Sequence, residues 1–165
     1  MSSDSNSIHI KKILVPIDVS QPSRKLAKFA FHLANLENAN LVIVNVIEDV
    51  KQGGPIGLQA KYGIVKVVEG FKKTKEESAR RLLSKVVQEQ EVTNKTGIRN
   101  VKTEILCHDR GKSIAWIITD YAKSNYTDLI VIGIRGQSKF RQFLEGNVAN
   151  GVISNSSCPV LVVLR

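Results

Sequence analysis

Aromatic residues are scarce in this chain: they make up 5% of its 165 residues, with a single tryptophan. Cysteine and histidine are also few, with two and three residues. Two cysteines cannot form a disulfide framework. Each ends an apolar run, which predicts buried free thiols at Cys107 and Cys158. The scattered histidines have no metal-ligand spacing, which argues against a zinc site or histidine-based catalysis.

Long hydrophobic runs are absent as well. No apolar stretch approaches the ~20 residues of a membrane span, and residues 1–9 lack the apolar segment of a signal peptide. We therefore expect a cytoplasmic protein with a flexible tail over residues 1–9 and no membrane partner. The net charge of +9 attracts anions such as nucleotides. Because the basic residues are dispersed and no aromatic stripe accompanies them, a nucleic-acid-binding role is disfavoured.

Aliphatic residues instead make up most of the 42% hydrophobic content. Along the chain their pattern changes repeatedly between that of a strand and that of a helix. Apolar runs typical of strands cover residues 12–17, 41–47, 101–107, 128–133 and 160–164. Helical spacing occurs between them, over residues 22–34, 73–91, 113–123 and 147–154. Strands that alternate with helices predict a parallel α/β sheet. The segment over residues 48–68 is rich in glycine and longer than a simple connector needs to be, so we interpret it as a variable flap.

Three glycines after the fourth predicted strand have a spacing that suits a phosphate. Gly133 and Gly136 are followed, nine residues later, by Gly146 and the polar residue that opens the next helix. Glycine lets backbone N–H groups approach an anion without a Cβ in the way. The first turn of a helix adds unpaired N–H groups and a partial positive charge. The alternative is a tight turn followed by an asparagine helix cap, which explains one glycine better than three.

Three segments together resemble the universal stress protein domain family. They are Lys12-Ile-Leu-Val-Pro-Ile-Asp-Val-Ser, residues 128–138 and residues 146–163. The glycine spacing is similar to that of the ATP-binding branch of the family, in which Ser or Thr follows the last glycine. This chain departs there, with Asn147. The resemblance runs from about residue 10 to residue 164 and implies one such domain over residues 10–165.

The resemblance implies a single doubly wound five-stranded parallel sheet with strand order 3-2-1-4-5 and helices on both faces, similar to adenine nucleotide alpha hydrolases. Ligands of open parallel sheets bind beyond the carboxyl ends of the strands, where the winding reverses. In this order that point lies between the first and fourth strands, next to Asp18 and Gly133. The same order places the third and fifth strands at opposite edges, which keeps Cys107 and Cys158 too far apart to bridge.

For the site, the resemblance implies adenine nucleotide binding. Asp18 would accept a hydrogen bond from the ribose or adenine, and Val46 would contact the adenine face. The glycines would admit the phosphates, and Arg135 would neutralise phosphate charge. The full set of expected nucleotide-binding residues is Pro16, Ile17, Asp18, Val46, Ile132, Gly133, Arg135, Gly136, Gly146, Asn147 and Val148.

These expectations amount to a dimeric ATP-binding regulatory module whose nucleotide occupancy is read by a partner or second subunit. The last strand would leave an open apolar edge, which gives a physical reason for a homodimer. ATP would bind with or without Mg²⁺ or Mn²⁺. No nucleophile-and-base pair is evident, so we expect at most slow hydrolysis. The alternatives are a dimerisation module that has lost ATP, a weak ATPase, or an enzyme on a related nucleotide-binding fold.

Overall fold

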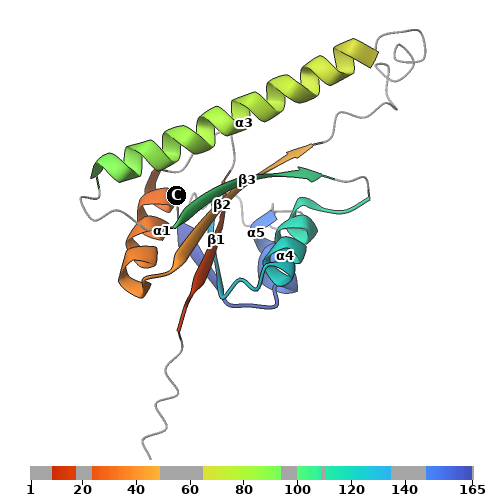
Figure 1. Cartoon of the computed structure of the whole chain (residues 1–165). Coiled ribbons are helices and arrows are strands. Elements are labelled where there is room, and N and C mark those ends of the chain that lie inside the picture. Colours follow the sequence, from red (N-terminus) through yellow and green to blue (C-terminus); the bar gives the residue numbers. More distant parts are fainter. Residues whose placement is uncertain are drawn as a thin grey trace, which may run out of the picture.

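The computed structural model describes residues 9–17, 24–48, 65–93, 100–108, 111–134 and 148–164. Its elements follow in the order β1 (Lys12–Pro16), α1 (Arg24–Glu37), β2 (Asn40–Glu48), α3 (Val65–Thr93), β3 (Val101–His108), α4 (Ile114–Ser124), β4 (Leu129–Ile134), α5 (Val148–Asn155) and β5 (Val160–Leu164). All strand pairs are parallel, and the sheet has the order β3-β2-β1-β4-β5 (Figure 1). The predicted fold class and strand order are confirmed.

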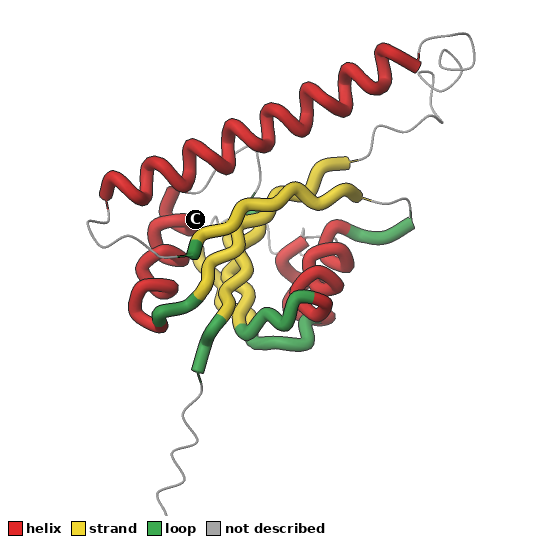
Figure 2. The backbone as a smooth tube through the Cα atoms, viewed as in Figure 1, coloured by secondary structure: helices red, strands yellow, loops and turns green. Residues whose placement is uncertain are grey.

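Helices cover both faces of the sheet. Figures 1 and 2 show α1 and α3 on one face and α4 and α5 on the other. Side chains alternate between the two faces along each strand. In β1, Ile13 and Val15 belong to the core beneath α1 and α3, whereas Leu14 belongs to the core beneath α4 and α5. Because both faces are covered, the central strands consist mostly of apolar residues.

The longest helix, α3, differs from its prediction. It begins at Val65 rather than near residue 73, so residues 65–68 are helical and do not belong to the flap. The start of this helix is hard to predict from the sequence, because a glycine inside a helix costs ~1 kcal/mol relative to alanine and Gly70 lies within its first turns. Ala79 and Leu83 are buried in the middle of α3. Its amino-terminal part extends past the sheet (Figure 1), and the side chain of Lys75 there is exposed.

The two cysteines lie on β3 and after α5, toward opposite edges of the sheet, as predicted. Both are free thiols. The expectation that both are buried is wrong, because Cys107 is exposed and Cys158 is half-buried. Cys107 is near the carboxyl end of an edge strand, where β2 is the only neighbouring strand in the described sheet.

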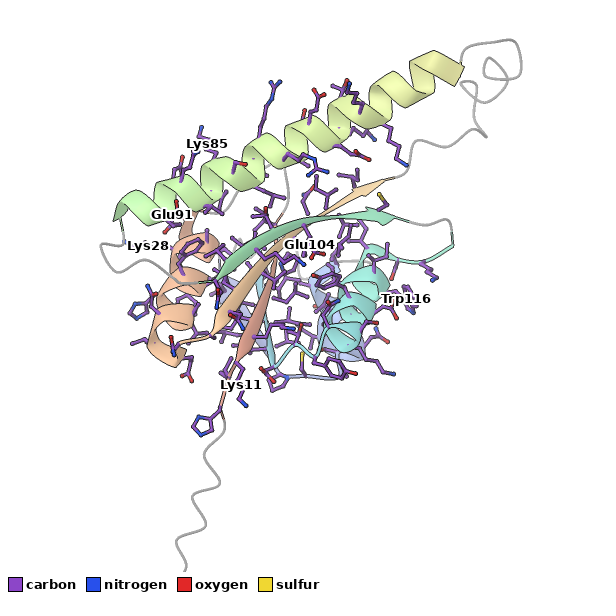
Figure 3. The ribbon with its side chains drawn as sticks, viewed as in Figure 1. Lys11, Lys28, Lys85, Glu91, Glu104 and Trp116 are labelled. Carbon is purple, nitrogen blue, oxygen red and sulfur yellow. The ribbon has the colours of Figure 1, made fainter. Side chains whose placement is uncertain are left out.

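The helix α4 carries a complete amino-terminal cap. The Ser113 hydroxyl accepts the Trp116 backbone N–H at 3.1 Å, which satisfies one of the unpaired donors of the first turn. The Trp116 ring lies on the outer side of the helix (Figure 3), with the Lys112 ammonium 3.8 Å from its centre. Among the described helices, none is both long and apolar enough to cross a membrane.

Candidate functional site

One carboxylate joins the amino ends of β1 and β4. Oδ2 of Asp128 accepts the backbone N–H groups of Lys11 at 2.9 Å and Lys12 at 2.8 Å. The Asp128 N–H donates to the Lys12 carbonyl at 3.0 Å. These bonds fix the register of the two central strands at the end of the sheet opposite to the ligand-binding end of such folds.

At their carboxyl ends the same two strands are not paired. The ladder between β1 and β4 ends at the pair Leu14↔Ile130, whereas the ladder between β1 and β2 continues to Pro16↔Val44. β4 meanwhile stays paired with β5 along its length. The sheet therefore loses its pairing between β1 and β4 at the point where the winding reverses, which is where open parallel sheets bind ligands.

Pro16 provides a physical reason for this early end of the ladder. The Lys12 carbonyl accepts from β4, and the Ile17 N–H donates to the Val44 carbonyl of β2 at 2.8 Å. Hydrogen-bonding groups of successive strand residues point to alternate neighbours, so the even-numbered residues of β1 face β4. Pro16 is one of these residues and has no N–H. β1 thus offers β4 no donor at this position.

Several of the predicted site residues gather on one face of the sheet. Val46 of β2, Ile132 of β4 and Val148 of α5 all belong to the core on the α4 and α5 side. Ile132 is 5% exposed, whereas Val46 and Val148 are only half-buried. By strand alternation the buried Pro16 points to this face as well, whereas Ile17 packs on the opposite face. The structure thus places four of the predicted residues on one face of the sheet. The side chain of Ile17 lies on the other face.

Gly133 lies near the carboxyl end of β4, half-buried and paired with Val163 of β5. The remaining predicted residues lie outside the described part of the chain; they are Asp18, Arg135, Gly136, Gly146 and Asn147. Residues 49–64, most of the predicted flap, also lie outside it. Within the described ranges, no three His, Cys, Asp or Glu side chains form a group that could hold a metal ion. The described part of the site is therefore an apolar surface that ends at a glycine.

One polar residue of this region was not predicted. Asn45 of β2 is 2% exposed, and its Nδ2 donates to the Ile17 carbonyl at 2.7 Å. Because a carbonyl only accepts, this contact also fixes which end of the amide is the nitrogen. The signal in the sequence was a single asparagine inside an otherwise apolar strand.

A polar contact elsewhere joins β3 to α4. Glu104 of β3 forms an ion pair with Lys102, and the Glu104 side chain is 26% exposed. The Lys102 hydrogen bond is the main cause that lowers the pKa of Glu104, and a hydrogen bond from Tyr121 of α4 acts in the same direction. Burial, and then the hydrogen bond to Glu104, raise the pKa of Tyr121. This contact anchors α4 to the middle of β3, away from the end of the sheet where Gly133 lies.

An open hollow of about 340 Å³ lies at the amino ends of the strands. Its lining includes Lys12, Asn40, Asn100 and Tyr121. The ammonium of Lys12 is already bound to the Asn125 carbonyl at 2.6 Å. Since parallel sheets place their ligands at the carboxyl end, this hollow is not the expected ligand site.

Comparison with known proteins identifies the family. The model of the universal stress protein family matches residues 9–163. The universal stress protein MJ0531 of Methanocaldococcus jannaschii is 32% identical over 94% of this chain and 82% of its own length. The Bacillus subtilis universal stress protein YxiE is 31% identical, over 92% of this chain and 97% of its own.

Solved structures agree with the sequence comparison. The universal stress protein UspA from Lactobacillus plantarum superimposes with a TM-score of 0.70 at 25% identity. The match covers 94% of this chain and 99% of that protein. The chain therefore belongs to the universal stress protein family.

Proposed function

We propose that this protein is a cytoplasmic, ATP-binding regulatory module that works as a homodimer. The observation that carries the proposal is the end of pairing between β1 and β4 at the switch point, beside an apolar surface built from β2, β4 and α5. Val46 and Val148 remain half-buried there, so a flat apolar ring such as adenine would cover them further. Burial of apolar area contributes ~25 cal/mol per Å².

Relatives of the same fold support an adenine nucleotide as the ligand. A universal stress protein from Archaeoglobus fulgidus was solved in complex with dAMP; it is 21% identical to this chain, with a TM-score of 0.62. Another universal stress protein was solved with cAMP, at 20% identity and a TM-score of 0.58. Those ligands belong to those proteins. For this chain they favour the adenosine moiety, and the glycine spacing favours a longer phosphate chain.

The phosphates would lie along the segment that joins β4 to α5. Gly133 is the last residue but one of β4, and α5 begins at Val148, directly after Gly146 and Asn147. Helix N–H groups without partners stabilise anions at such a position. The Asn147 amide can donate to a phosphate, as the family's hydroxyl does, and Arg135 would supply positive charge. Asp18, directly after Ile17, would accept a hydrogen bond from the ribose or the base.

Nucleotide occupancy would bias the arrangement of residues 133–146 and be read by a second subunit or another protein. The outer edge of β5 is the surface proposed for the second subunit. The Ile130 N–H donates to the Pro159 carbonyl, so the backbone groups of Val160 and Val162 face away from β4. Leu164 at the end of this strand is 57% exposed. Covering an open apolar edge with a second copy removes unpaired backbone groups from solvent.

The test is a search for bound nucleotide in freshly purified protein, by denaturation and mass spectrometry, followed by titration of Mg-ATP into stripped protein. Gly136→Val should abolish binding, because a branched side chain would block the approach of a phosphate. Ser84→Val on the exposed surface of α3 is the matched control and should bind as the wild type does. A dimeric wild-type protein that binds no adenine nucleotide contradicts the proposal and favours a dimerisation module without ATP.

A further inference from the structure

Asn45 is a buried amide in a position where an apolar residue would be expected. It is 2% exposed, and its strand neighbours Val44 and Ile43 are fully buried. Burial of an amide is unfavourable unless hydrogen bonds compensate for the lost water. Among the residues that the structure describes, the Oδ1 of Asn45 has no partner. Its single bond, from Nδ2 to the Ile17 carbonyl at 2.7 Å, is therefore the contact that accounts for its presence.

That bond acts directly after the end of β1. The Ile17 N–H donates to the Val44 carbonyl at 2.8 Å, so both backbone polar groups of Ile17 are held by consecutive residues of β2. The regular ladder of β1 ends one residue earlier, at Pro16. A side-chain amide has thus taken the place of a ladder N–H as the donor to the last described carbonyl of this segment. The Ile17 carbonyl is therefore paired although the ladder of β1 has already ended.

The peptide unit is planar, so a fixed carbonyl also fixes the direction in which the chain continues. The Ile17 carbonyl belongs to the peptide that links Ile17 to Asp18. Asn45 therefore sets the starting direction of the residue expected to contact the ribose or base. A backbone ladder cannot serve this purpose, because a continuing ladder would carry the chain on along β2.

We infer that Asn45 is a positioning residue of the nucleotide site: it orients the peptide that carries Asp18 and does not itself need to touch the nucleotide. This inference rests on the proposed function. It predicts that loss of the Nδ2 donor weakens nucleotide binding more than it weakens the fold. An apolar residue of similar size removes the uncompensated Oδ1 but leaves the Ile17 carbonyl without this donor, so some loss of stability accompanies the loss of binding.

The decisive variant is Asn45→Leu, which matches the shape of asparagine and cannot donate. We expect its dissociation constant for Mg-ATP to rise about tenfold or more, as for the loss of one well-placed hydrogen bond in the site. Asn125→Leu is the matched control. The Asn125 side chain also donates to a backbone carbonyl, that of Tyr121 at 2.9 Å, but lies at the amino end of the strands. Its dissociation constant should equal that of the wild type.

Asn45→His tests rescue, because an imidazole Nδ1–H can donate from nearly the same position. It should bind Mg-ATP more tightly than Asn45→Leu. Urea unfolding of the ligand-free proteins shows whether binding follows stability. A purely structural Asn45 would lower the unfolding midpoint of Asn45→Leu while its folded form bound as the wild type does, and this result overturns the inference. A wild-type protein without nucleotide binding overturns the proposed function instead.

A measurement on the wild type avoids any dependence on the folding of the variants. The side-chain amide protons of Asn45 should become more protected from exchange when Mg-ATP is added, because the ligand holds the segment after Ile17 in place. Those of Asn125 should not change. Equal behaviour of the two side chains, in a protein that does bind Mg-ATP, contradicts the positioning role.

Discussion

Gly151 of α5 packs directly against Ala115 of α4. A Cβ added at position 151 would lie 2.6 Å from the Ala115 Cβ, which is closer than real Cβ atoms approach one another. Ala115 is itself buried, at 6% exposure. The absence of one methyl group therefore sets how close the two helices come on this face of the sheet. Because α5 directly follows residues 133–147, their packing also fixes where that segment ends.

Gly151→Ala should destabilise the protein. Alanine gains ~1 kcal/mol of helix propensity over glycine, but overpacking a rigid contact costs ~1–3 kcal/mol. We expect a net loss of about 1 kcal/mol in the free energy of unfolding, measured with urea. Ala115→Gly should cost less in the Gly151→Ala background than in the wild type, because it removes the facing methyl group. A Gly151→Ala variant more stable than the wild type contradicts this packing.

Tyr121→Phe should make stability less sensitive to alkaline pH. Burial and the Glu104 hydrogen bond raise the pKa of folded Tyr121 above the usual tyrosine value of about 10. The stability that the protonated phenol contributes is full below about pH 10 and is lost as the pH rises further. Phenylalanine should cost about 1 kcal/mol at neutral pH, and this difference should shrink at higher pH. Tyr126→Phe, at an 86% exposed position, is the control and should have no such effect.

The contribution of Glu104 to stability changes with pH in the opposite direction to that of Tyr121. The pKa of Glu104 is lowered from 4.5, first of all by Lys102, so its contribution is present above that value and is lost as the pH falls through the folded pKa. Lys102→Met should therefore narrow the difference in unfolding free energy between neutral and acidic solution. Urea titrations at several pH values measure it. An unchanged acid dependence would show that Lys102 does not influence this carboxylate.

Asp128→Ala should destabilise the amino end of the sheet by about 1–3 kcal/mol, because the N–H groups of Lys11 and Lys12 lose their acceptor. Asp128→Asn should cost less, since both N–H groups donate to a single oxygen that asparagine retains. Asp120→Ala, exposed on α4, is the control and should change the free energy of unfolding by less than about 0.5 kcal/mol. Equal losses for the Ala and Asn variants would contradict the role of a shared oxygen.

Val162→Pro should dissociate the proposed dimer. The Val162 N–H points away from β4, so proline removes a donor from the free edge and leaves the β4–β5 ladder intact. Val163→Pro is the contrasting variant, because its N–H faces β4 and its loss should unfold the edge strand. Analytical ultracentrifugation and circular dichroism separate the two outcomes. A Val162→Pro protein that remains dimeric places the interface elsewhere.

Most of the fold could be predicted from the sequence because its strands are covered on both faces. Such strands are largely apolar, and helical periodicity between them leaves few topologies. The start of α3 could not be predicted, since Gly70 is typical of a connector and only the rest of the helix compensates for it. The exposure of Cys107 depends on its place at an edge, which an apolar run does not reveal.

The site was predicted less completely than the fold. The face shared by Val46, Ile132 and Val148 follows from strand alternation and order, and the structure places all three in one cluster. The role of Asn45 could not be deduced, because a lone asparagine in a strand does not tell which carbonyl it will meet. The ligand roles of Asp18 and of the glycines after Gly133 stay predictions that nucleotide titration tests.

Pro16 limits how far the two central strands β1 and β4 can pair. Any other residue at that position would carry an N–H toward β4 and so tend to extend the ladder between the two central strands. A substitution of Pro16 that stabilises the sheet in this way would also close the gap in pairing between β1 and β4. A more stable sheet and the proposed ligand site thus place opposite demands on residue 16, and engineering for thermostability should leave this proline unchanged.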